Sequence, residues 1–381
     1  MVRHDVLKLD SNMVGDRVVH TSIPFTRVTS GGALKKPLKL MAVVASLTLI
    51  AGVAVAPSAQ AAKVKLCLAL DTGGVDDRSF NEGAWKGAQA SLVSTAEYLP
   101  ASSSADFAPN IKKFVDKGCE LIVGVGFAIS AEIVKSAKAN PKIKYAVVDD
   151  AGQDCDANWV CKDVPNVKGL TFQTDEAAFM AGYLAAGMTK TGKVATYGGA
   201  PYPTVTIFMD GFARGVAHYN KLKGKSVQVL GWDPAKPASG TFVGNFSDQA
   251  KALTISKGFE QQGADIILPV GGILGASYAA ESEKTKKSLT IWVDSDAYNT
   301  LTAGKSIILS TVVKEIGASI KSVAKDVADK KFTASKYVGT LKNKGVSLAP
   351  YHDLSGRVPG TLKNEIRAIR DSIIAGKLKV N

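Results

Sequence analysis

From residue 64 to the end of the chain, short apolar runs alternate with longer segments in which apolar residues recur every three or four positions. The short runs are rich in Val, Ile and Leu on both faces, which is typical of strands buried in a parallel sheet. The predicted strands are 64–70, 121–125, 143–148, 167–171, 193–197, 226–230, 265–270, 289–293 and 306–309. The stretch 99–110 is rich in Ala, Ser and Pro and shows no clear strand.

Helical spacing of apolar residues predicts helices between these strands. Several of them follow a Ser or Asp, which is a helix start signal. The apolar positions of the predicted helices are Phe80, Ala84, Trp85, Ala88 and Leu92; Leu253 and Phe259, after Ser247-Asp248; Val312, Val313, Ile316, Ile320, Val323 and Val327; and Leu362, Ile366, Ile369, Ile373 and Ile374.

Alternation of strand and helix over about 320 residues indicates an α/β fold with parallel sheets. Two doubly wound lobes fit this length better than one long sheet. No linker rich in Pro, Gly or Ser separates the lobes, so we expect the chain to cross between them in ordered hinge segments. The expected hinges are near 170–174, 295–305 and 330–345. The expected lobes are 62–172 with part of 297–345, and 173–296 with part of 346–381.

The first 61 residues do not follow this alternation. Three lysines precede an apolar run at 40–56, and the small-x-small sequence Ala59-Gln60-Ala61 follows. This order is typical of a secretory signal peptide, which we place at 34–61 with cleavage after Ala61. The alternative is a membrane anchor, for which this run of about 17 residues, rich in Ala and Gly, is marginal in length.

Residues 1–33 are polar and aperiodic, and they precede the predicted export signal. We interpret them as an extension that is not part of the native protein, with translation starting at position 34. The protein is then expected outside the cytoplasm, secreted or associated with the cell surface.

The chain has a formal net charge of +13, and its 46% of hydrophobic residues is ordinary for a globular protein. Removing residues 1–61 leaves 40 Lys and Arg against 31 Asp and Glu, a net charge of +9. No block of five Lys or Arg remains. Nucleic-acid binding requires a concentrated basic patch, so we do not expect it.

All four cysteines lie in the expected mature chain, where export permits disulfides. Cys155 and Cys161 bracket a short polar loop and are the better candidate pair, and Cys67 with Cys119 is the second. His is scarce and no Cys-x-x-Cys occurs, so we expect no metal site. Cys67 lies too far behind the apolar run to be a lipid-modified cysteine.

The segment 71–81, directly after the first predicted strand, is the strongest candidate binding site. Ligands of doubly wound sheets bind at the carboxyl ends of strands. Gly73-Gly74 allows close approach of the backbone to a ligand. Asp71 can accept a hydrogen bond, and Phe80 can offer a ring face. The alternative is a capped turn with a core Phe.

Other predicted strands also end in Gly or Asp, and Phe208 lies in the second half of the chain. An Asp and a Lys together suit vicinal hydroxyl groups, because one accepts and the other donates. For Lys314 alone the alternative is a solvated helix residue. The further candidates are Asp149, Phe208, Gly271, Gly272, Asp294 and Lys314.

No catalytic constellation is present in the sequence after residue 61. Its two histidines, His218 and His352, lie outside the strand-end clusters, and no Gly-x-Ser-x-Gly occurs. Polar and aromatic groups without a nucleophile or a titrating base favour binding over catalysis, and we expect neither enzyme activity nor a cofactor.

Several motifs together resemble the basic membrane protein family, the PnrA-like substrate-binding proteins of ABC importers. The resemblance covers roughly 64–330. The motifs are 71–81 with Trp85, 176–186, 192–194, Phe208 with Gly211-Phe212, 263–267, 293–296 and Lys314.

This resemblance implies a type I periplasmic-binding-protein fold, with a purine nucleoside held between two lobes joined by three crossovers. It implies a base stacked between Phe80 and Phe208, ribose hydroxyls held by Asp294 and Lys314, and ligand contacts from Asp71 and Asn81. Asp149 is expected at the base edge, and Gly271 or Gly272 near the sugar. Many members are lipoproteins, which this chain is not expected to be.

The function expected from the sequence is therefore that of a monomeric extracytoplasmic binding protein that delivers a purine nucleoside to an ABC permease. Three alternatives stay open. The ligand could be a simple sugar or another small solute, the protein could be a nucleoside sensor without a transport role, or it could be an enzyme acting on nucleosides.

Overall fold

The computed structural model describes residues 63–158 and 160–381. The extension expected at 1–33 and the signal peptide expected at 34–61 lie outside the described residues. Within the described ranges, no helix is long and apolar enough to span a bilayer.

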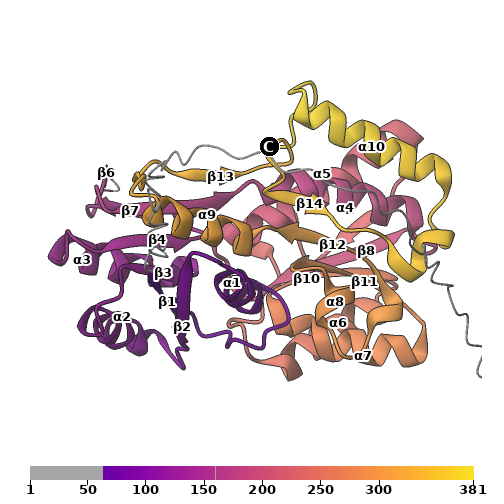
Figure 1. Ribbon diagram of the computed structural model, residues 1–381. Helices are drawn as coiled ribbons and strands as arrows, with labels where there is room; N and C mark the ends of the chain where they lie inside the picture. The colour runs from indigo at the N-terminus through magenta and orange to yellow at the C-terminus, as the bar shows by residue number, and fades with distance from the viewer. Residues whose placement is uncertain (1–62, 159) are drawn as a thin grey trace, which may run out of the picture. The chain divides into compact units, whose positions relative to one another are not determined.

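Two six-stranded sheets form the centre of the fold (Figure 1). The first has the spatial order β13 (Tyr337–Gly339), β7 (Val167–Phe172), β4 (Lys144–Val148), β3 (Leu121–Val125), β1 (Val64–Leu70) and β2 (Ser94–Leu99). The second has the order β14 (Val346–Leu348), β12 (Ile308–Lys314), β11 (Leu289–Asp294), β10 (Ile266–Val270), β8 (Lys193–Gly198) and β9 (Gln228–Leu230). All neighbouring strands are parallel except β12 and β14.

Helices cover the sheets, as expected for an α/β fold. Those of the first lobe are α1 (Phe80–Gln89), α2 (Phe107–Asp116), α3 (Ser130–Ala139) and α9 (Ile316–Ala328). Those of the second are α4 (Thr174–Met188), α5 (Pro203–Lys223), α6 (Gln249–Gln261), α7 (Ala276–Thr285), α8 (Ala297–Thr300) and α10 (Gly360–Ile374). The 3-10 turns are η1 (Ser104–Asp106), η2 (Phe127–Ile129), η3 (Pro237–Ser239), η4 (Gly272–Gly275), η5 (Lys305–Ile307) and η6 (His352–Arg357).

The α/β fold with two doubly wound sheets and three crossovers is confirmed. The chain passes from the first sheet to the second after β7, returns after β12 and passes back after β13. The first and third crossovers lie where hinges were expected. The second does not, because β11 and β12 pair with each other in the second sheet, so 295–305 connects neighbours within one lobe.

Strand β1 shows how the apolar runs build the core. Leu66, Leu68 and Leu70 pack into the core cluster that contains residues of α1 and α9. Cys67 and Ala69 point to the other face and join the cluster formed with α2 and α3. The strand is therefore apolar on both faces because both faces are covered by helices.

The last predicted strand was wrong in its bounds. Residues 305–307 form the turn η5, and the strand continues to Lys314, so Val312 and Val313 belong to β12 rather than to a helix. Ser310 and Thr311 are buried in it, and Ser310 Oγ donates to the Ala349 carbonyl at 2.7 Å. The prediction relied on an unbroken run of apolar residues, and these two polar residues interrupt it. Hydrogen bonds to neighbouring segments allow them to be buried in the strand.

Short or polar strands were missed. Strand β2 lies at the edge of the first sheet with mostly half-exposed residues, so it lacks the apolar signal of a central strand. Strands β13 and β14 are three residues each. Leu92, predicted in the first helix, lies beyond its end and is 88% exposed.

The motif 176–186, which begins Glu-Ala-Ala-Phe, lies in α4, and α4 packs closely on α5. A Cβ added at Gly182 would meet the Phe212 carbonyl oxygen at 2.0 Å, and one at Gly215 would meet the Phe179 carbonyl oxygen at 2.0 Å. The glycines therefore allow the two helix backbones to touch. This motif of the sequence serves packing of the second lobe.

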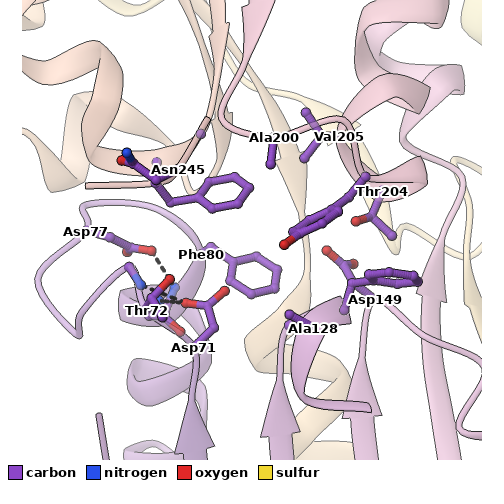
Figure 2. A pocket seen from close by; sticks show the side chains of 18 of the residues that line it. Asp71, Thr72, Asp77, Phe80, Ala128, Asp149, Ala200, Thr204, Val205 and Asn245 are labelled. Carbon is purple, nitrogen blue, oxygen red and sulfur yellow. Dashed lines mark hydrogen bonds between the residues drawn. The ribbon is translucent and has the colours of Figure 1, made fainter. Parts of the chain in front are cut away.

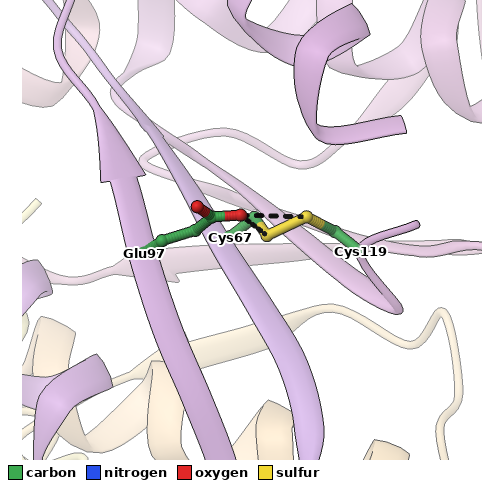
Figure 3. A group of neighbouring side chains, drawn as sticks. All are labelled: Cys67, Glu97 and Cys119. Atoms are coloured by element: carbon green, nitrogen blue, oxygen red, sulfur yellow. Dashed lines mark hydrogen bonds between the residues drawn. A yellow bond between two sulfur atoms is a disulfide. The ribbon is translucent and has the colours of Figure 1, made fainter. Parts of the chain in front are cut away.

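Both expected disulfides are present, Cys67–Cys119 and Cys155–Cys161. The second closes the hairpin of β5 (Gln153–Cys155) and β6 (Cys161–Asp163). The first joins β1 to the residues before β3 and is buried beside Glu97 of β2 (Figure 3). With its sulfurs bonded to each other, this group offers no thiolate to a metal.

Candidate functional site

A cavity of about 280 Å³ lies between the two sheets, at the carboxyl ends of their strands (Figure 2). Its lining includes all nine residues singled out from the sequence as ligand contacts. They are Asp71, Phe80, Asn81, Asp149, Phe208, Gly271, Gly272, Asp294 and Lys314.

The loop after β1 is held by carboxylates that accept from the backbone. The Asp77 carboxylate accepts from the backbone N–H groups of Ser79 at 2.9 Å, Asn81 at 2.8 Å and Glu82 at 3.1 Å. It therefore caps the first turn of α1. Asp71 accepts from Asn81 Nδ2 at 2.7 Å. These contacts fix Phe80, the first residue of α1, facing the cavity.

Asp149 and Asp294 occupy equivalent places in the two lobes. Asp149 follows β4 and Asp294 ends β11, and these strands hold the same position in the order of their sheets. Both adopt left-handed backbone conformations, with φ of 69° and 65°. Such conformations cost roughly 1 kcal/mol or more, and aspartate is among the residues that tolerate them. Both strained residues place a carboxylate in the cavity lining.

Lys314 joins the lobes inside the cavity. Its Nζ lies 3.0 Å and 2.8 Å from the two carboxylate oxygens of Asp149, and 3.4 Å from Asp294 Oδ1. Lys314 comes from the second sheet and Asp149 from the first, so this ion pair crosses between the lobes. Lys314 is 5% exposed and ends a strand, so it is not a solvated helix residue.

Burial and neighbouring charge set the protonation of this cluster. Burial raises the pKa of the Asp149 carboxyl to about 6, although the Lys314 ammonium beside it acts to lower that pKa. Burial also raises the pKa of Asp71, against the hydrogen bonds from Asn81 and Gly73. Burial acts to lower the pKa of Lys314, but the carboxylates of Asp149 and Asp294 raise it above its ordinary value. Asp149 and Lys314 therefore each stabilise the charged form of the other against the effect of burial.

Aromatic rings form another part of the lining. The ring centroids of Phe127 and Tyr202 lie 5.5 Å apart, and those of Tyr202 and Phe246 lie 6.0 Å apart. In Figure 2 the Phe80 ring lies in the middle of the cavity, with Asp71 and Asp149 to either side. Lys314 Nζ is 4.8 Å from the Phe80 centroid, close enough for a cation–π contact.

Two buried acceptors in the lining have no hydrogen-bond partner in the described residues. They are Asn81 Oδ1 and Asp294 Oδ1, of which the second lies in an ion pair with Lys314 Nζ at 3.4 Å. Buried acceptors without a hydrogen bond are costly, and a hydroxyl or N–H donor from a ligand would satisfy them.

The lobes also touch directly beside the cavity. Ser79 Oγ lies 2.7 Å from the Val293 carbonyl oxygen and 3.0 Å from Asp294 Oδ2. Ser295 Oγ donates back to the Ser79 carbonyl at 2.7 Å. These contacts link the start of α1 in the first lobe to the end of β11 in the second.

Sequence reasoning missed several residues of the lining. Asp77, Phe127, Tyr202, Asn245 and Phe246 all line the cavity but were not chosen. Asp77 could have been found from its place just before a predicted helix, and Phe127 from its place after Gly126 at a strand end. Tyr202 could have been found from its place shortly after Gly198-Gly199 at another strand end, whereas Asn245 and Phe246 lie in a segment with no strand-end signal.

We expect Asp77 to make folding stability depend on pH. Burial raises the pKa of Asp77 to about 7, despite the three N–H groups it accepts from. The folded protein therefore holds a proton there that the unfolded chain, with an ordinary pKa of 3.8, has lost. Stability from this group is fully present below pH 3.8 and is lost progressively as the pH rises to the folded pKa of about 7.

Urea unfolding of wild type between pH 8 and pH 6 checks this expectation. The free energy of unfolding should increase toward pH 6, with a smaller contribution of the same sign from Asp149. Asp77→Asn should reduce that increase, whereas Asp76→Asn, an exposed neighbour, should leave it unchanged. If the free energy of unfolding depended on pH equally in wild type and in Asp77→Asn, this result would contradict the raised pKa assigned to Asp77.

Comparison with known proteins identifies the family. The family described as ABC transporter substrate-binding protein PnrA-like matches residues 64–381. The chain belongs to this family. This confirms the resemblance seen in the strand-end motifs, and it extends the match beyond residue 330 to the end of the chain.

Relatives in the PnrA-like family cover most of the chain. It is 28% identical to the ABC transporter nucleoside-binding protein BmpA of Lactococcus lactis subsp. cremoris over 338 residues, 83% of this chain and 89% of the relative. It is 30% identical to basic membrane protein A1 of Borrelia garinii subsp. bavariensis over 304 residues, 79% of this chain and 80% of the relative.

Solved structures confirm the type I periplasmic-binding-protein fold. A solute-binding protein of an ABC transporter system from Aeropyrum pernix K1 superposes with a TM-score of 0.69 at 21% identity, covering 83% of this chain and 92% of that chain. A second solute-binding protein of an ABC transporter system, from Conexibacter woesei, superposes with a TM-score of 0.62 at 21% identity, covering 83% of this chain and 98% of that chain. PnrA-like proteins are a family of substrate-binding proteins, so the cavity between the lobes is the candidate substrate site.

Proposed function

We propose that the protein binds a purine nucleoside in the cavity between its lobes and delivers it to an ABC permease from outside the cytoplasm. One observation carries the proposal: the cavity combines a buried cluster of carboxylates and one ammonium with several aromatic rings. Hydroxyl-rich and aromatic parts of one ligand would match these two kinds of lining. The relative from Lactococcus lactis is named a nucleoside-binding protein, which supports the same class of ligand.

The ribose would lie at Lys314 and Asp294. Lys314 is a donor only, and Asp294 Oδ1 lies 3.4 Å from its Nζ in an ion pair and accepts no hydrogen bond from the described residues. Two adjacent ribose hydroxyls can each accept from the ammonium and donate to a carboxylate. Charge-assisted hydrogen bonds of this kind are the strong ones in a buried site.

The base would stack on Phe80 from the first lobe. For the second ring we propose Phe246 in place of Phe208. Phe208 is only 2% exposed although the cavity beside it is open, so it turns little ring area toward a ligand. Phe246 is half-buried and stacks on Tyr202. Asn81 Oδ1, with no partner, would accept from an N–H group of the base.

Charge favours a nucleoside over a nucleotide. Four carboxyl groups line the cavity, those of Asp71, Asp77, Asp149 and Asp294, against one ammonium, Lys314. A phosphate would lie among these carboxyl groups, and those that are ionised would repel it at low dielectric. A neutral ligand with several donors suits the lining.

Titration calorimetry with adenosine, guanosine, inosine, cytidine, ribose and adenosine monophosphate tests the proposal. We expect binding of at least one purine nucleoside, with much weaker binding of ribose and of the monophosphate. Preference for ribose or another sugar over every nucleoside would establish the sugar-binding alternative instead. Transport itself is tested by growth on the bound nucleoside with and without the gene.

A further inference from the structure

A second cavity lies at the opposite edge of the second sheet. It is lined by Ile266 and Leu289, the first residues of β10 and β11, whereas the ligand cavity is lined by Val270 and Asp294, the last residues of the same strands. At about 3.3 Å per residue, the two cavities are separated by roughly the length of a strand, about 15 Å. The volume of this second cavity is about 470 Å³.

The lining of this cavity, here called the basic pocket, carries four cations. They are Lys190, Lys286, Lys287 and Arg357, and all four are exposed. Among the described residues none of these four forms an ion pair. The carboxylate in the lining, Asp265, accepts from Thr189 Oγ1 at 2.5 Å and from the Lys190 backbone N–H at 2.7 Å, so it holds the backbone there.

The positive charge of the chain is concentrated in the same lobe. Residues 173–314 and 340–381, which form the second lobe, contain 22 Lys and Arg against 14 Asp and Glu, a net charge of +8. Residues 63–172 and 315–339 of the first lobe contain 18 against 17, a net charge of +1. Residues 340–381 contribute most to this difference, with 8 Lys and Arg against 3 Asp and Glu.

We propose that the basic pocket docks the second lobe on an anionic phospholipid surface, with a headgroup phosphate held among its cations. A membrane favours this assignment over a free anion. The four cations are exposed, so each contributes little to a single phosphate in water. A membrane presents many fixed phosphates, and each Lys or Arg near it contributes about a factor of five in affinity.

The location fits a protein that works at a membrane. The basic pocket is at the far end of the second sheet from the ligand cavity, so a docked protein keeps its substrate site unobstructed. Docking through cations also requires no lipid-modified cysteine. This inference goes beyond the proposed function and does not depend on the identity of the ligand.

Vesicle sedimentation tests the proposal with the chain from residue 62, which is the form left by the expected cleavage and includes the compact part of the structure. We expect binding to vesicles of phosphatidylcholine with phosphatidylglycerol, and none to phosphatidylcholine alone. Lys286→Glu/Arg357→Glu should weaken binding by about tenfold or more, because two contributing cations are lost and reversed. The matched control Lys113→Glu/Lys142→Glu, on exposed sites of the first lobe, should change it by less than about twofold.

Both variants lower the net charge equally, so an equal loss in the two would overturn the proposal in favour of a general charge effect. So would absence of binding to the anionic vesicles, or tight binding of inorganic phosphate without vesicle binding. Lys190→Glu/Lys287→Glu, in the same pocket, should reproduce the loss. Thermal unfolding of each variant separates loss of docking from loss of fold.

Discussion

Lys314→Met is expected to weaken binding of the ligand by about 100-fold. Lys314 supplies the ammonium group that lies among the carboxyl groups of the cavity. Its Nζ lies within 3.0 Å of both carboxylate oxygens of Asp149. A hydrogen bond to a charged group contributes about 1.5–3 kcal/mol, and the variant removes such a bond to the ligand. It also leaves Asp149 and Asp294 buried without their counter-ion, which costs about 3–5 kcal/mol when a buried pair is broken.

Calorimetry and urea unfolding of the variant measure these two effects separately. Lys321→Met, an exposed lysine on α9, is the matched control and should leave both unchanged. Lys314→Met/Asp149→Asn removes the unpaired carboxyl of Asp149, so it should recover stability without recovering affinity. Wild-type affinity in Lys314→Met would rule out a ligand contact by this residue.

Phe80→Ala is expected to weaken nucleoside binding by about 5- to 150-fold, because stacking of a base on an aromatic ring contributes about 1–3 kcal/mol. Phe80 begins α1 and faces the cavity, where it also lies 4.8 Å from the Lys314 ammonium. A ligand without a base would lose much less affinity on the same substitution. The comparison of adenosine with ribose in calorimetry therefore reports stacking rather than a general defect of the site.

Two further substitutions identify the second ring. Phe246→Ala should weaken nucleoside binding as Phe80→Ala does, whereas Phe208→Leu should change it little, because Phe208 is almost fully covered by protein. Phe332→Ala, on a ring that contacts Lys144 and Lys168 of the first lobe, is the control outside the cavity. A larger loss of affinity in Phe208→Leu than in Phe246→Ala would instead support the pairing of Phe80 with Phe208 that the family resemblance implies.

The central strands and the strand-end residues could be predicted because their signals are local. Buried strands such as β1 are apolar on both faces, and a Gly or Asp follows several of them directly. The edge strand β2 and the three-residue strands β13 and β14 could not be predicted, because these segments are held as strands by pairing with strands that are distant in sequence. Tyr202 and Phe246 lie at the cavity because of the path that their loops take, and the periodicity of apolar residues does not predict that path.

The excess of positive charge in the second lobe is already visible in the sequence. Residues 63–172 contain 13 Lys and Arg against 14 Asp and Glu, whereas residues 173–381 contain 27 against 17. The chain returns to the first lobe for α9 and β13 before ending in the second. The structure therefore moves 315–339 to the first lobe and changes the net charges of the lobes from −1 and +10 to +1 and +8.

The matching order of the two sheets has a consequence for how a ligand is oriented. Asp149 directly follows β4 and Asp294 ends β11, so the two carboxylates come from corresponding strands of the two sheets. The next strands outward are not equivalent at the cavity, because Lys314 at the end of β12 lines it and Phe172 at the end of β7 does not. A ligand with a polar end and an apolar end therefore has a preferred direction, because the ammonium group comes from one lobe alone.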